Sequence, residues 1–253
     1  MIYNFKKLLI SILIFWGFIA LGQDFSTAGF YQTDSEVRQA MNFNVGWRFI
    51  KKDAQGAEKV DYDDSTWAVV NLPHGLEILP LAASGGINYQ GPAWYRKHFI
   101  ADKKFEGKKV MLHFEGIMGK SKIWINGVLV RKNFGSYYPI HIDISNYLNF
   151  EGQNVIAVRP DNSNDPLYPP GKDQEKLDFT YFGGIYRDVW LITHNDLYVT
   201  HPLAVDKKAG GGVFVHFENL SEKSADVFTD VDIANEGPSK KVSLELRLED
   251  FKE

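Results

Sequence analysis

The sequence predicts an all-β protein: a jelly-roll sandwich followed by the first strands of an immunoglobulin-like sandwich. Apolar and polar residues alternate over many short runs, and Gly, Pro, Asn or Asp bounds each run. No stretch has the apolar periodicity of a long amphipathic helix. The chain is 44% hydrophobic and 14% aromatic, which supplies a core and excludes a disordered protein.

The first segment, residues 1–22, has the pattern of a secretory signal peptide. Lys6 and Lys7 precede an apolar run that ends in Ala20-Leu21-Gly22. A membrane-spanning helix needs about 20 apolar residues, and this run is shorter. We therefore expect cleavage after Gly22, export to the periplasm or the medium, and no stable membrane association afterwards.

Residues 23–195 are expected to form the jelly roll. Phe43, Val45, Trp47 and Phe49 alternate with other residues, which indicates a half-buried strand. Further strands are predicted at residues 94–100, 109–115, 121–125, 128–131, 154–159 and 188–193. Asn126-Gly127 predicts a tight hairpin turn, because both positions tolerate positive φ. The pattern also allows two helical turns over residues 35–41.

A second group of strands is predicted at residues 213–217, 227–234 and 242–248, where the loops become short and plain. An immunoglobulin-like sandwich needs about seven strands in about 100 residues. Residues 196–253 are therefore expected to form an incomplete sandwich of this type.

Charge and side-chain chemistry exclude several function classes. The 28 Lys and Arg do not exceed the 32 Asp and Glu, so a nucleic-acid partner is not expected. The absence of cysteine removes disulfides, thiolate nucleophiles and Cys-ligated zinc. No two of the seven histidines have a spacing such as His-x-x-x-His, and His113 and His141 fall within strand patterns. We therefore expect no metal site and no cofactor.

Five motifs follow one another in a fixed order along the chain: Gly46-Trp47-Arg48-Phe49, Leu72-Pro73-His74, Trp94-Tyr95-Arg96, Phe114-Glu115-Gly116 with Ile125-Asn126-Gly127, and Gly183-Gly184-Ile185-Tyr186-Arg187. This succession resembles the N-terminal sugar-binding domain of glycoside hydrolase family 2, the family of β-galactosidases, β-glucuronidases and β-mannosidases. The resemblance implies a galactose-binding-like jelly roll and an oligosaccharide, or a sugar derived from a polysaccharide, as partner.

The segment from residue 160 to residue 182 is long for a connection within a compact sandwich, and loops of this length are often functional. It interleaves aromatic residues with carboxylates and amides, as a sugar site requires. The resemblance implies that Asp178 contacts the terminal sugar, and that an amide before the Trp94 strand, Asn88 or Gln90, makes a second contact. Tyr181 is a further candidate, and His74 either caps a turn or faces the sugar.

The resemblance also implies retaining hydrolysis by two glutamates, both on a barrel that follows the immunoglobulin-like domain. A barrel takes about 250 residues, and no such number remains after the jelly roll and the immunoglobulin-like strands. We therefore expect no catalytic residue in this chain. Asn235-Glu236 repeats an Asn-Glu pair of the family, but it is interpreted as a turn. We therefore expect the chain to be the truncated N-terminal part of a secreted exo-β-glycosidase and to be inactive alone.

Two alternatives remain open. In the first, the sandwich is a stand-alone carbohydrate-binding module, with Tyr168 and Tyr181 exposed as stacking platforms. In the second, the strands form a structural repeat without a ligand, which the ordered motifs disfavour.

Overall fold

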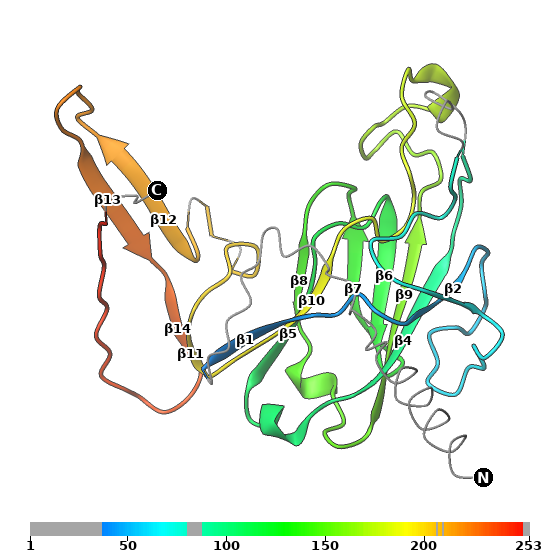
Figure 1. Cartoon of the computed structure of the whole chain (residues 1–253), viewed down its shortest axis with the longest axis horizontal. Coiled ribbons are helices and arrows are strands. Elements are labelled where there is room, and N and C mark those ends of the chain that lie inside the picture. The colour runs from blue at the N-terminus through cyan, green and yellow to red at the C-terminus, as the bar shows by residue number, and fades with distance from the viewer. Residues whose placement is uncertain (1–36, 80–87, 206, 209, 250–253) are drawn as a thin grey trace, which may run out of the picture.

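The computed structural model describes residues 37–79, 88–205, 207–208 and 210–249. Two antiparallel sheets face each other in a jelly-roll sandwich (Figure 1). One sheet has four strands, in the order β1 (Arg38–Asn42), β10 (Val189–His194), β5 (Lys109–Phe114) and β8 (Ile140–Asp143). The other has six, in the order β3 (Ala68–Val70), β2 (Trp47–Ile50), β4 (Trp94–Ile100), β9 (Gln153–Asp161), β6 (Lys120–Ile125) and β7 (Val128–Phe134).

The core lies between the two sheets, where every second residue of the strands points inward. Trp47 and Tyr95 from the six-stranded sheet meet Leu112 and Phe114 from the four-stranded sheet, and all four side chains are fully buried. Burial of each such side chain stabilises the fold by about 1.5–3 kcal/mol. The alternation that predicted the strands is therefore also the pattern that fills the core.

A second, polar cluster lies on the outer face of the six-stranded sheet. The guanidinium of Arg96 is fully buried and donates to a carboxylate oxygen of Asp64 at 2.7 Å. It also donates to the backbone carbonyls of Ala57 and Lys59, and His98 contacts the same carboxylate at 2.7 Å. This ion pair ties the segment between β2 and β3 to the sheet.

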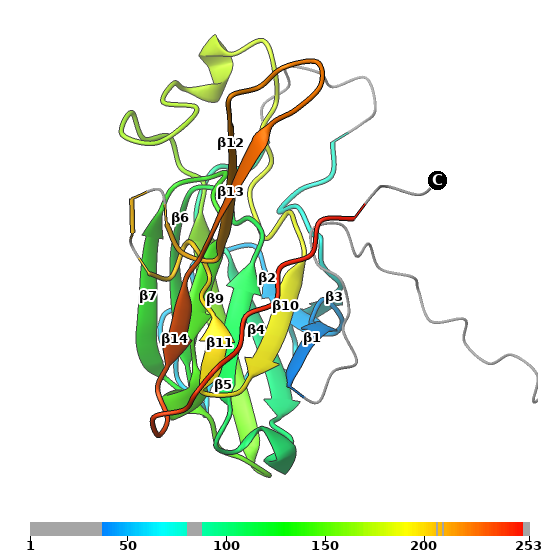
Figure 2. The same cartoon turned by 90° about the vertical axis from the view of Figure 1, so that its left-hand side faces the viewer.

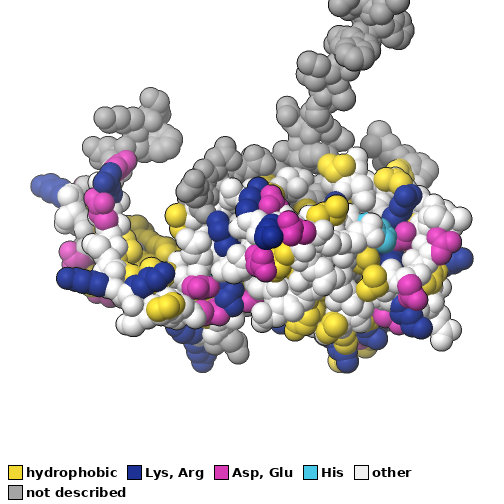
Figure 3. Space-filling model, turned by 90° about the horizontal axis from the view of Figure 1, so that it is seen from below, with side chains coloured by type: hydrophobic (Ala, Val, Ile, Leu, Met, Phe, Trp, Pro, Cys, Tyr) yellow, Lys and Arg dark blue, Asp and Glu magenta, His cyan; other side chains and the backbone are white. Residues whose placement is uncertain are grey.

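Two short ladders follow the sandwich. β11 (Leu197–Val199) pairs with β14 (Ile233–Asn235), and β12 (Val213–Glu218) pairs with β13 (Asp226–Val231). They form an arm beside the sandwich, and Figure 2 shows the molecule from the side on which this arm lies. Hydrophobic side chains gather on the inner side of this arm (Figure 3). A cavity of about 700 Å³ lies between arm and sandwich, lined mainly by apolar residues.

Three short 3-10 helices complete the described structure: η1 (Lys103–Phe105), η2 (Ser145–Tyr147) and η3 (Gln174–Lys176). No helix in the described ranges is long and apolar enough to span a membrane. The predicted signal peptide, residues 1–22, lies outside these ranges. The predicted boundary at residues 195 and 196 falls between β10 and β11 and stays a prediction.

Most predicted strands are confirmed, and so is the Asn126-Gly127 turn, with φ of 50° and 82° at its two residues. The helical turns expected over residues 35–41 are wrong where the chain is described, because residues 38–42 form β1 and pair with β10. The strand expected at 242–248 is also wrong: this segment is exposed and pairs with no strand in the described structure. β3, β8 and β11 were not predicted.

Candidate functional site

The connection between β9 and β10 forms a long loop that rises above one end of the sandwich (Figure 1). Gln174 in η3 anchors it, and this side chain is only 2% exposed. Its Oε1 accepts from the Asn88 backbone N–H at 2.7 Å, and its Nε2 donates to Asn88 Oδ1 at 2.9 Å and to the Tyr181 carbonyl at 3.2 Å. Asn88 Nδ2 donates to the same carbonyl at 2.8 Å. Gln174 and Asn88 thus brace the loop, and the polar atoms of Asn88 are engaged within the protein.

Tyr181 crosses the base of the loop, and its side chain is 5% exposed. Its hydroxyl lies 3.0 Å from Asn164 Oδ1 and 3.3 Å from Gln90 Oε1, and it can donate its one proton to either oxygen. Gln90 Nε2 is buried and has no hydrogen-bond partner among the described residues. Gln90 is therefore the amide of the two predicted candidates that still has a donor to offer.

Two glycines let the chain pass close beneath this loop. A Cβ on Gly183 would lie 2.5 Å from Asn162 Nδ2, and a Cβ on Gly184 would lie 2.6 Å from the His74 carbonyl oxygen. Gly184 also has φ of +108°, which side chains rarely adopt. Asn162 itself accepts from the Gly91 backbone N–H at 2.9 Å and is fully buried. The Gly-Gly motif thus serves the close packing of three backbone segments.

His74 lies within this packing. Its Nδ1 is hydrogen-bonded to the Tyr95 hydroxyl at 2.8 Å, and its ring meets the ring of Phe49 edge-on with centroids 4.6 Å apart. Burial lowers the pKa of the imidazole below its usual value. A neutral His74 held by Tyr95 forms part of the wall under the loop.

Asp178 differs from the other candidates because it is exposed and makes no hydrogen bond or ion pair within the part of the chain that the structure describes. Phe179 next to it is 46% exposed, and Phe182 is 40% exposed. A carboxylate offers about four acceptor positions to hydroxyl groups, and aromatic faces suit the C–H surface of a sugar ring. The loop therefore presents the two chemistries that carbohydrate recognition needs.

The expectation that Tyr168 and Tyr181 are exposed stacking platforms is wrong. Tyr168 is 4% exposed, and its hydroxyl donates to the Ser163 carbonyl within the loop. Sequence analysis also missed Gln174, Asn162 and Asn164, which order the loop. The only sequence signal for these residues is the large number of amide side chains in the loop. The hydrogen-bond partners of Gln174 and Asn162 lie more than 70 residues away along the chain.

Glu236 lies apart from this loop, directly after β14. Its carboxylate is ion-paired with Lys109 at 2.5 Å and accepts from the Tyr198 hydroxyl at 2.8 Å. The hydrogen bond from Lys109 holds the pKa of Glu236 below its usual value. The preceding Asn235 donates to the Gly237 and Pro238 carbonyls, as in a turn.

A two-sheet jelly roll with polar loops gathered at one end is an architecture that lectin domains use, and the braced loop with its free carboxylate fits this class of sugar-binding sandwich. The family model described as glycosyl hydrolases family 2, sugar binding domain, matches residues 46–195. The chain belongs to glycoside hydrolase family 2.

Three relatives illustrate the likeness. A β-galactosidase of Thermoanaerobacter pseudethanolicus is 39% identical over 64% of this chain and 22% of its own length. A β-glucuronidase of Formosa agariphila is 36% identical over 82% of this chain and 22% of its own length. The solved structure of a family 2 β-glucuronidase matches with a TM-score of 0.69 and 33% identity, over 82% of this chain and 23% of that one. The chain thus spans about a fifth of the length of these relatives.

Proposed function

We propose that this chain is the non-catalytic N-terminal part of a secreted family 2 exo-β-glycosidase that acts on terminal β-galactosides or β-glucuronides. The two curated relatives named above are a β-galactosidase and a β-glucuronidase, and each is matched over 22% of its length. In this proposal the two glutamates of the retaining mechanism lie on a barrel outside these 253 residues.

The observation that carries the proposal is the braced loop with Asp178, whose carboxylate has no partner among the residues that the structure describes. The loop is fixed on both sides of Asp178, because Gln174 is hydrogen-bonded to Asn88 and to the Tyr181 carbonyl. The position of Asp178 is therefore set before any ligand arrives. An ionised carboxylate that accepts from sugar hydroxyls makes charge-assisted hydrogen bonds, which are about twice as strong as neutral ones. We propose that Asp178 selects the non-reducing terminal sugar. We also propose that Gln90, whose Nε2 is buried in the structure, turns this nitrogen toward one of the sugar oxygens when the ligand binds.

An NMR titration of the full chain with methyl β-galactoside and methyl β-glucuronide tests this role. One of the two sugars is expected to shift the amide signals of residues 88–91 and 178–182, with a dissociation constant of the order of millimolar (about −4 kcal/mol). Asp178→Asn is expected to weaken this binding at least about tenfold, since a charged acceptor is lost.

Asp173→Asn is the matched control, because Asp173 lies in the same loop and is already paired with Lys176 at 2.8 Å. It should leave the affinity unchanged. Shifts that fall elsewhere on the sandwich, no shifts with either sugar, or equal affinity in the Asp178 variant would each contradict the proposed site.

The exposed rings of Phe179 and Phe182 favour a second candidate function, a carbohydrate-binding module that acts alone. The same titration separates the two. The module would bind with a dissociation constant of the order of micromolar (about −8 kcal/mol), and replacing both rings by alanine would abolish this binding. A chain that forms only one wall of a larger site would bind weakly.

Export is the remaining part of the proposal, supported by the pattern of residues 1–22. Expression of the full chain in a bacterium with a periplasm should yield a periplasmic or secreted protein whose first residue is Gln23. A cytoplasmic product that keeps Met1 would contradict it.

A further inference from the structure

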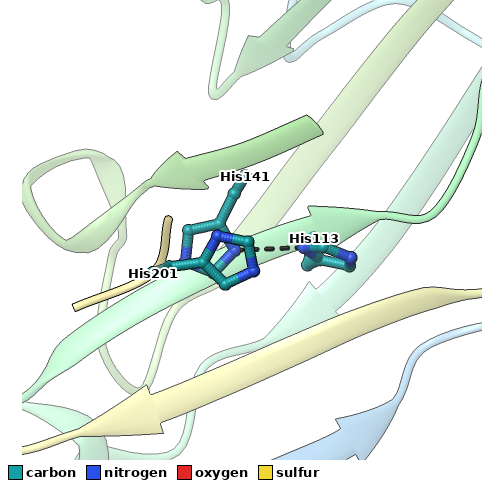
Figure 4. A group of neighbouring side chains, drawn as sticks. All are labelled: His113, His141 and His201. Carbon is teal, nitrogen blue, oxygen red and sulfur yellow. Dashed lines mark hydrogen bonds between the residues drawn. The ribbon is translucent and has the colours of Figure 1, made fainter. Parts of the chain in front are cut away.

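Three histidines from separate parts of the chain meet at the junction between the sandwich and the arm. His113 on β5 lies directly opposite His141 on β8 in the register of the two strands. His201 follows β11 and stacks on His141 with ring centroids 4.0 Å apart (Figure 4). One nitrogen from each ring lies within 4.8 Å of the other two. Strand pairing and the path of the chain after β11 therefore gather three imidazoles that the sequence separates by 28 and 60 residues.

The distances suit one small cation. Zn–N bonds of about 2.0–2.1 Å place two nitrogens of a tetrahedral site about 3.3 Å apart. His113 Nδ1 and His141 Nδ1 are already 3.1 Å apart, joined by a hydrogen bond. A cation between them would replace this hydrogen bond once the donor ring moves its proton to Nε2. His201 has to turn out of its stack on His141 for its nitrogen to approach by up to about 1.5 Å.

The three rings are uncharged at neutral pH. Burial, together with the charge that His201 would carry, lowers the pKa of His113 to about 4, and burial lowers that of His141 to about 3. Burial also lowers the pKa of His201. At neutral pH each imidazole thus keeps one lone pair, the form that binds metal. In His201 this lone pair accepts from the Leu203 backbone N–H at 3.2 Å, a hydrogen bond that metal binding would replace.

The cluster can be reached from the cavity of about 700 Å³ between the arm and the sandwich, since His141 and His201 line it. Arg38 lines the same cavity, and its positive charge acts on His141. It is exposed on β1, so solvent screens its repulsion of a bound cation. The open side leaves room for a water molecule as a fourth ligand.

We propose that His113, His141 and His201 bind one divalent transition-metal ion of the class that prefers imidazole, such as Zn²⁺, and that this ion clamps the start of the arm to the four-stranded sheet. His113 and His141 belong to the sandwich, whereas His201 belongs to the arm, in the segment between β11 and β12. A bound ion would therefore couple the two parts. It would stabilise the folded chain, because binding to the native state alone raises stability.

Zinc titration of the full chain against a chromophoric chelator tests this proposal. The absence of cysteine removes thiolates as competing ligands. We expect one Zn²⁺ per chain with a dissociation constant of about 10 µM or below (about −7 kcal/mol), and a higher midpoint of thermal unfolding in its presence. Co²⁺ in the same site should show the visible absorption of a tetrahedral ion.

His201→Gln and His141→Gln should each weaken zinc binding at least about tenfold, since a three-ligand site becomes a two-ligand site. His201 lies outside the strands, so its replacement should leave the fold intact. His216→Gln on the β12–β13 hairpin is the matched control and should bind zinc as the wild type does. Wild-type affinity in both cluster variants, equal loss in the His216 variant, or no stoichiometric uptake by the wild type would overturn the site.

Discussion

Replacing Gln174 by alanine removes the side chain that ties the long loop to Asn88. Without it, the buried Asn88 N–H loses its acceptor at 2.7 Å, and Asn88 Oδ1 loses its donor at 2.9 Å. A buried polar group left unsatisfied costs about 1–3 kcal/mol. Allowing for water that enters the loosened loop, we expect a local loss of about 2–4 kcal/mol.

Amide hydrogen exchange measures this loss at the residue concerned. Because each 1.4 kcal/mol changes the opening equilibrium about tenfold, the Asn88 amide should exchange roughly 30- to 700-fold faster in Gln174→Ala. The strands of the core should keep their protection, since the opening is local. The loop should also become the first site of proteolytic cleavage.

Glu175→Ala is the control, because Glu175 is the next residue of η3 and is exposed. It should leave exchange at Asn88 unchanged. If Gln174→Ala exchanges no faster than this control, the loop is held by other contacts, and the preorganisation of Asp178 that we infer is refuted.

Three further outcomes follow from the structure. Asp64→Ala leaves the buried Arg96 guanidinium without its carboxylate partner. We expect a loss of about 3–5 kcal/mol, visible as a large drop in urea midpoint that Asp63→Ala should not show. Burial raises the pKa of Asp64, but the hydrogen bonds from His98 and Arg96 lower it by more, so that this pKa lies below its ordinary value in the folded protein. The stabilisation is therefore present above the pKa of Asp64 in the unfolded chain, about 3.9, and is lost as pH falls through its pKa in the folded protein. Wild type and Asp64→Ala should therefore converge in stability in acid. A difference in stability that stays constant with pH would contradict this. Gly184→Ala places a Cβ 2.6 Å from the His74 carbonyl and should destabilise by about 1–3 kcal/mol, measured by thermal unfolding, whereas an unchanged midpoint would mean that the backbone shifts freely.

The jelly roll could be predicted because its signals are local. Alternation marks each strand, and Asn126-Gly127 marks a turn with two positive φ values, which the structure has. The four residues of β8 gave too short a pattern to be recognised. β1 was mistaken for helical turns, because its strand character comes from pairing with β10, more than 140 residues away.

The site could be predicted only in part, for the same reason. Asp178 was singled out through its place before the Gly-Gly motif, and the structure finds it exposed and unpaired within the described chain. The bracing role of Gln174 depends on a contact 86 residues away, which no spacing reveals. The histidine cluster was missed because metal ligands were sought at short helical spacings, whereas strand register brings His113 and His141 together.

Hydrolysis of nitrophenyl β-galactoside and nitrophenyl β-glucuronide by the purified full chain tests directly whether the chain is non-catalytic. Because we propose that both glutamates of the retaining pair lie outside these residues, the rate should equal that of buffer alone. Turnover that copurifies with the protein through successive columns, and that Glu236→Gln abolishes, would contradict it.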